Sequence, residues 1–194
     1  MEYTFTPFTK QETNLTWWDG AFTEDELDIL QLLVKQQKEA ATVGGNVTQA
    51  ELHNIRRSRV GWLSNDKEYS WVYNKLAHVV NNINADYYQF DLTGFGEPLQ
   101  LTNYDAGQQG MYTWHQDFGS TGVSRKLSLV LQLSYPNEYE GGNLEVMNGS
   151  QASIVSRARG HIAIFPSWVL HQVTPVISGS RQSLVTWITG PAFR

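Results

Sequence analysis

From about residue 88 onward the sequence is a succession of short strand-like runs, and this pattern limits the possible folds more than any other feature. Gly, Asn, Asp or Pro separates each run from the next. The expected strands are Tyr88–Leu92, Leu99–Tyr104, Tyr112–Gln116, Leu127–Ser134, Gly142–Val146, His161–Phe165, Leu170–Val173 and Ser183–Thr189. Short strands at this spacing predict a sandwich or a jelly roll and argue against a βαβ array.

Ahead of these runs the periodicity is helical. Thr23 and Glu26 have the spacing of a helix capping box, in which each side chain bonds the backbone N–H of the other residue. Apolar residues then recur at helical spacing, which predicts a helix to about residue 38. Residues 69–85 show a second amphipathic stretch and predict a second helix. The two helices would support one sheet from outside.

The two patterns together predict one domain over residues 1–194, mainly β in class, with supporting N-terminal helices. Residues 1–88 would form a helical support region. This region is also expected to contain a short strand at Leu15–Trp18 and one or two strands within residues 47–60. Residues 89–194 would form the strand-rich core.

The composition of the chain excludes several classes of partner and of chemical site. The formal net charge of −5 argues against a nucleic-acid partner, because phosphate contacts need Lys and Arg. The chain has no cysteine, which excludes disulfides, zinc–thiolate sites and iron–sulfur clusters. No apolar run approaches membrane-spanning length, and the first ten residues lack the pattern of a signal peptide. We therefore expect a cytoplasmic protein with no membrane partner.

The strongest chemical signal is His115-Gln-Asp117. Residues i and i+2 of a strand point to the same face, so this imidazole and this carboxylate can chelate one metal ion. His171, at the start of another expected strand, would be the third ligand. Two His and one carboxylate on one face of an octahedron form the facial triad of non-haem Fe(II) oxygenases. Taken alone, His-x-Asp also fits a surface His beside a turn-forming Asp.

Arg181 follows His171 by ten residues. A buried Arg would need an anionic partner, which a dicarboxylate co-substrate could supply through a bidentate pair. The alternative is an Arg that caps a strand end. Tyr112 precedes His115 by three residues, so its hydroxyl is expected near the metal, whereas Tyr104 and Tyr112 could equally be core aromatics. His161 is expected to have no carboxylate partner.

Several linked motifs occur in one order across roughly residues 100–190. They are Tyr104…Tyr112-x-x-His115-x-Asp117, Gly141-Gly142-Asn143-Leu144, Gly160-x-x-x-x-Phe165-Pro166-Ser167, His171-x-Val173-x-Pro175-Val176 and Gly179-x-Arg181. In this order they resemble the prolyl 4-hydroxylase-like branch of the 2-oxoglutarate/Fe(II) oxygenases. The compact microbial and viral members called PKHD-type hydroxylases are especially similar. The N-terminal hundred residues match only loosely.

The resemblance implies a double-stranded β-helix (jelly-roll) core. It implies iron ligands at His115, Asp117 and His171, with the distal carboxylate of 2-oxoglutarate on Arg181. Pocket-lining roles are implied for Tyr104, Tyr112 and Trp187. Gln132 falls near a position that helps this Arg in the family, although a hydroxyl residue is frequent there. The implied cofactors are Fe(II), 2-oxoglutarate and O₂, with stimulation by ascorbate.

The implied reaction is hydroxylation of a prolyl residue in a protein or peptide, coupled to decarboxylation of 2-oxoglutarate to succinate. The segment from Gly44 to Ser64 is expected to form either a lid over a peptide groove or an ordinary solvent-facing hairpin. Its candidate substrate-binding residues are Arg56, Arg59 and Trp62. Two alternatives stay open: the same chemistry on a free amino acid, another side chain or a nucleobase, and a non-catalytic jelly-roll module that binds metal.

Overall fold

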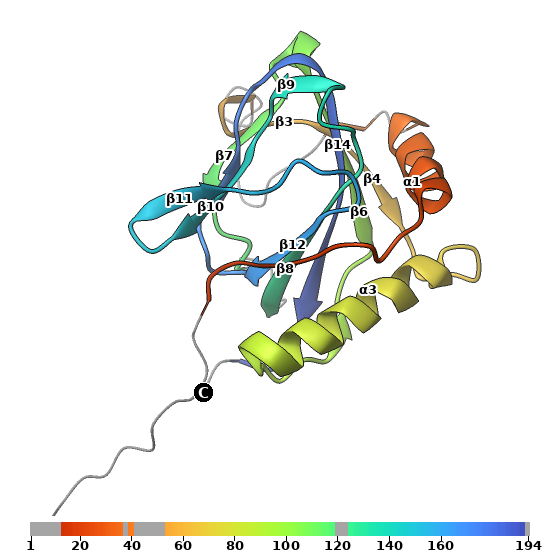
Figure 1. Ribbon diagram of the computed structural model, residues 1–194, viewed down its shortest axis with the longest axis vertical. Helices are drawn as coiled ribbons and strands as arrows, with labels where there is room; N and C mark the ends of the chain where they lie inside the picture. Colours follow the sequence, from red (N-terminus) through yellow and green to blue (C-terminus); the bar gives the residue numbers. More distant parts are fainter. Residues whose placement is uncertain (1–12, 37–38, 41–52, 119–123, 193–194) are drawn as a thin grey trace, which may run out of the picture.

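Two antiparallel sheets face each other and form a jelly roll, with two helices against the outer face of the larger sheet (Figure 1). The computed structural model describes residues 13–36, 39–40, 53–118 and 124–192. The predicted mainly β class is confirmed. In the described ranges, no helix has the length and apolar character needed to cross a membrane.

The larger sheet has the strand order β1-β12-β8-β14-β6-β4-β2. Its strands are β1 (Thr16–Trp18), β12 (Ile162–Pro166), β8 (Arg125–Gln132), β14 (Val176–Thr189), β6 (Leu99–Asp105), β4 (Arg59–Leu63) and β2 (Glu39–Ala40). The short strands β5 (Gly94–Phe95) and β9 (Tyr139–Gly141) also pair with β14. The smaller sheet contains, in order, β11 (Gln151–Ile154), β10 (Leu144–Asn148), β13 (His171–Val173), β7 (Met111–His115) and β3 (Arg56–Arg57).

Helices α1 (Glu24–Gln36) and α3 (Ser70–Ile83) pack on the larger sheet. The predicted capping box begins α1: the Thr23 N–H donates to Glu26 Oε2 at 2.8 Å, and the Glu26 N–H donates to Thr23 Oγ1 at 3.3 Å. The interface between helices and sheet is apolar and includes Leu27, Leu30, Val72, Leu76, Leu129, Leu131 and Leu184. The helices therefore support one sheet from outside, as predicted.

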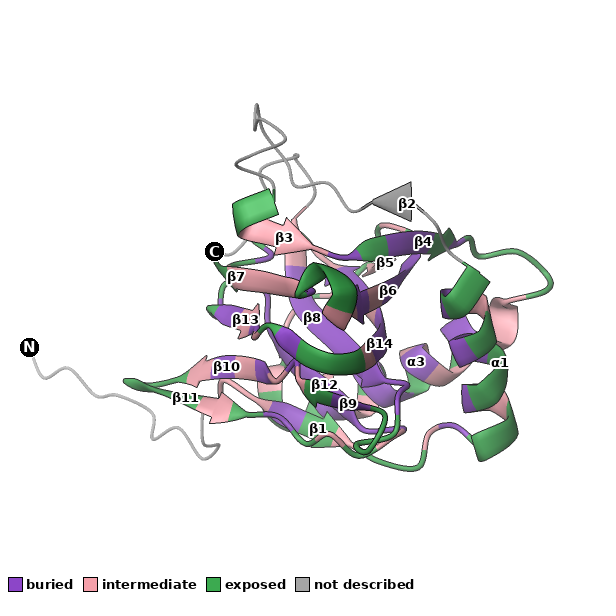
Figure 2. Ribbon diagram, turned by 90° about the horizontal axis from the view of Figure 1, so that it is seen from above, coloured by how far each residue is buried: buried purple, intermediate pink, exposed green. Residues whose placement is uncertain are grey.

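A second apolar cluster lies between the two sheets. It joins side chains of both sheets, among them Val130, Ala163 and Phe165 from the larger and Val146 and Val173 from the smaller. Figure 2 shows buried strands β8 and β14 between the helices on one side and the smaller sheet on the other. Some of these apolar side chains, Val130 and Val173 among them, also line the cavity of the candidate site.

The predicted strand Tyr88–Leu92 is wrong. Residues 84–88 continue α3 as a π-helix (Asn84–Tyr88), and Gln89 ends it with a left-handed φ of 55°. The Asn84 side chain causes the reversal, because it accepts from the Phe90 N–H and donates to the Phe90 carbonyl. The Tyr88 hydroxyl donates a hydrogen bond to the Ile164 carbonyl at 2.9 Å. The next strand begins only at Gly94.

The N-terminal region does more than support the core, because β1, β3 and β4 belong to the two sheets. Residues 56–57 and 59–63 are thus strands rather than a free hairpin, and residues 44–52 of the expected lid segment lie outside the described residues. β14 is longer than expected, since Gly179 (φ 69°) continues it past the predicted turn. A side chain at Gly179 would clash with the Glu138 carbonyl.

Candidate active site

The three predicted metal ligands meet at the open end of the space between the sheets. His115 ends β7 and His171 begins β13, and these two residues are paired neighbours in the smaller sheet. Asp117 follows β7, and its N–H donates to the Ser167 carbonyl at 2.9 Å. One candidate ligand atom from each residue lies within 4.8 Å of the other two. The structure therefore brings His171 together with two residues that precede it by 54 and 56 positions in the sequence.

Both imidazoles are oriented for metal binding. Nδ1 of His115 lies 2.7 Å from the Thr113 carbonyl oxygen, and Nδ1 of His171 lies 3.0 Å from that of Val169. When Nδ1–H donates to these carbonyls, each Nε2 keeps its lone pair. The two Nε2 atoms lie 3.6 and 3.3 Å from the Asp117 carboxylate oxygens.

The charges at this point also suit a cation. Burial would raise the pKa of Asp117, but the facing His171 and His115 imidazoles lower it below its usual range, so the carboxylate is ionised. Burial, followed by the neighbouring His171, lowers the pKa of His115 to about 4, so this imidazole is neutral at pH 7. Ser128 Oγ donates to Asp117 Oδ2 at 2.7 Å and fixes the carboxylate. A divalent metal would therefore find an anionic oxygen beside imidazole nitrogens.

Arg181 lies on β14, faces the same cavity and is only 3% exposed. Its guanidinium approaches Ser183 Oγ at 3.5 Å and the Tyr104 ring at 5.6 Å. Within the described chain it forms no ion pair, and a buried charge without a counter-ion is costly. The carboxylate of a ligand would supply the missing partner.

These groups line one cavity of about 430 Å³, which includes space open to solvent. Its polar lining holds the triad, Arg181, Arg56 and Ser183, and its apolar lining includes Val130, Leu144, Val173, Val185 and Trp187. Residues 99–189 match the model of the 2OG-Fe(II) oxygenase superfamily. This part of the jelly-roll core is therefore similar to the 2OG-Fe(II) oxygenase superfamily. The similarity accounts for a metal triad and a buried cation sharing one cavity.

Part of the chain is also similar to named proteins. A PKHD-type hydroxylase of Prochlorococcus marinus is 44% identical over 79 residues, which cover 40% of this chain and 35% of that protein. The aligned segment is thus little more than a third of the relative's length.

Solved structures support the fold over nearly the whole chain. A Pseudomonas putida prolyl-4-hydroxylase superposes with a TM-score of 0.71 at 19% identity and covers 93% of this chain and 94% of its own. A Trichoplax adhaerens prolyl hydroxylase, in complex with a hypoxia inducible factor peptide fragment, gives a TM-score of 0.73 at 16% identity. That match covers 91% of this chain and 84% of the other. At these identities the likeness shows the shared jelly roll.

A β-bulge places Tyr112 beside the oxygenase triad. His115 pairs with His171 but Tyr112 pairs with Val173, so β7 has one residue more than β13 between the two pairs. The extra residue turns Tyr112 and His115 to the same side, where their rings stack with centroids 3.4 Å apart. Burial raises the pKa of Tyr112 to about 12, so its hydroxyl stays protonated and can donate.

Trp187 lines the cavity as expected, with 6% exposure. Its indole N–H is buried and faces the Asp117 carboxylate, whose pKa it helps to lower. The Arg125 guanidinium lies 3.8 Å from the ring and is held by a bidentate pair with Glu97. Trp62 is half exposed and its ring lies 6.5 Å from that of Trp187, so it flanks the cavity without lining it.

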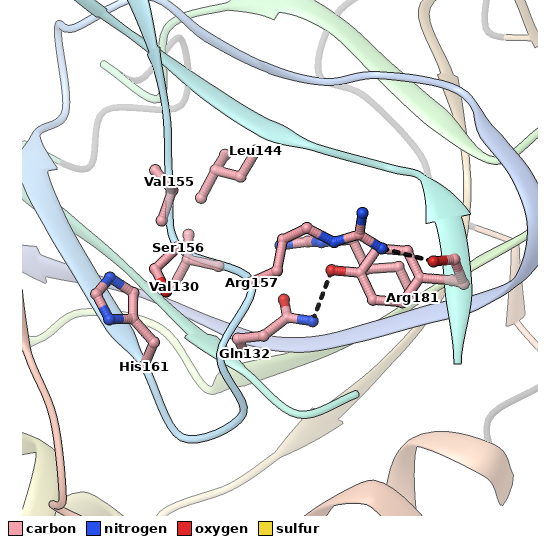
Figure 3. A pocket seen from close by; sticks show the side chains of 9 residues that line it. Val130, Gln132, Leu144, Val155, Ser156, Arg157, His161 and Arg181 are labelled. Atoms are coloured by element: carbon pink, nitrogen blue, oxygen red, sulfur yellow. Dashed lines mark hydrogen bonds between the residues drawn. The ribbon is translucent and has the colours of Figure 1, made fainter. Parts of the chain in front are cut away.

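Two expected site residues lie elsewhere. The Gln132 amide donates to the Tyr139 hydroxyl at 3.1 Å and to the Ser134 carbonyl, and the side chain lines a smaller adjoining cavity (Figure 3). It lies beside Arg181 but does not line the metal cavity. Arg59 is exposed and, by strand alternation, lies on the opposite face of β4 from Trp62.

The sequence analysis missed Ser128, Ser183 and Arg125. Ser128 is a polar residue between two leucines on β8, and Ser183 follows Arg181 by two residues, so alternation could have found both. Arg125 had no such signal. His161 was expected to have no carboxylate partner, and this was wrong: its Nδ1 lies 2.8 Å from Asp19 Oδ1, far from it in sequence.

Proposed function

We propose that this protein is an Fe(II)- and 2-oxoglutarate-dependent dioxygenase that hydroxylates a prolyl residue in a protein or peptide. The observation that carries the proposal is that one cavity contains the triad and a buried arginine with no counter-ion among the described residues. Iron held by these residues would activate O₂, the oxidant that converts 2-oxoglutarate to succinate and CO₂ and supplies the oxygen for hydroxylation. Ascorbate is expected to stimulate turnover.

Each polar residue has a distinct task. Nε2 of His115, Nε2 of His171 and the Asp117 carboxylate would hold the metal, with Ser128 fixing the carboxylate. Arg181 would bind the distal carboxylate of 2-oxoglutarate, assisted by the Ser183 hydroxyl. The Tyr112 hydroxyl would donate to a ligand oxygen near the metal.

The prolyl substrate rests on two kinds of support. Relatives carry the name PKHD-type hydroxylase, and structural neighbours are prolyl hydroxylases, one of them bound to a peptide. The cavity wall of Val130, Leu144, Val173, Val185 and Trp187 is apolar, as a pyrrolidine ring requires. The half-exposed Trp62 at the side of this wall could contact a peptide chain.

Turnover tests the proposal directly. The protein is incubated with Fe(II), ascorbate, 2-oxoglutarate and a proline-containing peptide library in air. We expect succinate and peptides heavier by one oxygen, with fragmentation placing the oxygen on Pro. Succinate without peptide oxidation would keep the oxygenase and reject the prolyl substrate. No succinate with any peptide, free amino acid or nucleobase would favour a non-catalytic metal-binding module.

A further inference from the structure

Arg56 is a second cation that faces the metal cavity. It lies on β3 at the edge of the smaller sheet and lines the cavity with the triad and Arg181. Its Nε donates to Ser58 Oγ at 2.9 Å and its Nη2 to Gln100 Oε1 at 2.8 Å. Its Cζ lies 4.8 Å from the centre of the Tyr112 ring. All three partners are uncharged, so in the described residues Arg56 has no counter-ion.

The geometry leaves part of the guanidinium free. An arginine has five N–H donors, and the two recorded hydrogen bonds use one on Nε and one on Nη2. Donors on both Nη atoms remain. The ring of Tyr112, stacked on His115 and flanked by Arg56, fixes the guanidinium close to the triad. A group held in place before binding loses little conformational freedom when it binds an anion.

The charge balance of the cavity also leaves Arg56 available for an anion. The charged residues that line it are Arg56, Arg181 and Asp117. His115 and His171 also line it but carry no charge in the metal-bound state, because a metal binds the neutral form of an imidazole. The charges of a divalent metal and of doubly charged 2-oxoglutarate cancel. The Asp117 carboxylate offsets one arginine. One positive charge therefore remains after both cofactors are bound, and Arg56 is the cation without an assigned partner.

We propose that Arg56 is a subsite for a carboxylate carried by the substrate. The inference rests on the proposed function and deepens it: the preferred substrate has an acidic group close to the residue that is hydroxylated. Carboxylates match the planar fork of a guanidinium. The carboxylate could be the side chain of an acidic residue beside the proline, or the α-carboxylate of a C-terminal or free proline.

Matched ligands separate these sources. The protein is loaded with Mn(II) and 2-oxoglutarate under nitrogen, and binding is measured by calorimetry. One pair of peptides, acetyl-Ala-Pro-Glu-amide and acetyl-Ala-Pro-Gln-amide, tests a side chain after Pro, and acetyl-Glu-Pro-Ala-amide with its Gln analogue tests one before it. Acetyl-Ala-Pro with a free carboxylate and its amide tests the α-carboxylate.

We expect the acidic member of at least one pair to bind about tenfold more tightly, the magnitude typical of one hydrogen-bonded charge pair. Arg56→Gln should abolish this preference, and Arg56→Lys should keep part of it. Arg57→Gln is the matched control: it neutralises the adjacent arginine, whose guanidinium instead bonds the Gln109 and His53 carbonyls. Arg57→Gln should leave the preference unchanged.

The outcomes distinguish this inference from the proposed activity. Equal binding within every pair, or a preference that survives in a folded Arg56→Gln variant, overturns the carboxylate subsite even when peptide hydroxylation is observed. Absence of binding by every probe overturns it as well. Conversely, a carboxylate preference that depends on Arg56 supports the subsite even when no succinate forms, in which case only the proposed activity fails. In both variants, 2-oxoglutarate affinity should stay within about twofold of wild type, because Arg181 binds that ligand.

Discussion

The two faces of the larger sheet have opposite chemistry although they share the same strands. On β8, Leu127, Leu129 and Leu131 point toward the helices and are fully buried among apolar side chains. Their neighbours Ser128 and Val130 point into the space between the sheets, where Ser128 holds the Asp117 carboxylate. Alternation with a period of two thus assigns stability to one set of residues and chemistry to the other.

The two faces of β14 differ in the same way. Arg181, Ser183, Val185 and Trp187 line the cavity, whereas Leu184 and Ile188 pack in the cluster under the helices. The inner face can keep a buried arginine because the outer face supplies the apolar burial that stabilises the fold. Substitutions on the inner face should therefore change binding and turnover, and substitutions on the outer face should change the free energy of unfolding.

The largest effect is expected for the triad. His115→Ala or Asp117→Ala should reduce succinate formation to background, because each removes a metal ligand, while the circular dichroism spectrum stays that of the folded protein. His53→Ala, at an exposed histidine, is the control and should retain activity. Unfolding of the triad variants would show that these residues are structural and would break the comparison between the faces.

Adjacent residues on β8 give the most direct contrast. Leu131→Ala should lower the free energy of unfolding by about 2–5 kcal/mol, because it empties a fully buried site under the helices. Val130→Ala should cost less stability but raise the substrate concentration needed for half-maximal rate, since Val130 lines the cavity. Urea denaturation and steady-state kinetics measure the two quantities. The reverse assignment would contradict the account.

Arg181→Gln should raise the 2-oxoglutarate concentration for half-maximal rate about a hundredfold, the loss expected for two charge-assisted hydrogen bonds. Metal affinity, measured by titration with Mn(II), should change little. The ligand-free variant should be no less stable than wild type, because the substitution removes a buried charge that has no counter-ion among the described residues. An unchanged 2-oxoglutarate dependence would reject this role for Arg181.

The smallest effect is expected for Gln132, an inner-face residue that lies outside the metal cavity. Gln132→Ala should cost about 1 kcal/mol of stability, because the Tyr139 hydroxyl loses its donor. The 2-oxoglutarate requirement should change by less than about twofold. A change as large as that of Arg181→Gln would show that Gln132 binds the co-substrate after all.

The sequence was sufficient to predict an element or a site residue where nearby residues in the chain determine its environment. The His-x-Asp spacing predicted that His115 and Asp117 lie close together, although Asp117 lies just past the end of β7, and the capping box and apolar spacing located the first helix. It failed where distant residues decide. The expected strand at Tyr88 is the end of a helix, where the Tyr88 hydroxyl donates to the distant Ile164 carbonyl, and the partner of His161 lies far away at Asp19.

The bulge in β7 belongs to this second group, and so do the different surroundings of Arg56 and Arg57. Nothing in the sequence around Tyr112 and His115 reveals that β7 carries one residue more than its partner strand, yet this residue stacks the two rings. Arg56 and Arg57 are indistinguishable in sequence. Only the pairing of β3 with β7 directs one of them to the cavity and the other to backbone carbonyls.

The central claim is that one cavity binds a divalent metal through the triad and 2-oxoglutarate through Arg181. The most direct measurement is an anaerobic titration of the metal-free protein with Fe(II) in the presence of 2-oxoglutarate, followed by visible absorption. We expect a weak metal-to-ligand charge-transfer band in the wild-type protein, no band in Asp117→Ala, and a band that requires far more 2-oxoglutarate in Arg181→Gln. Absence of the band in wild type, or its persistence in Asp117→Ala, would contradict the account.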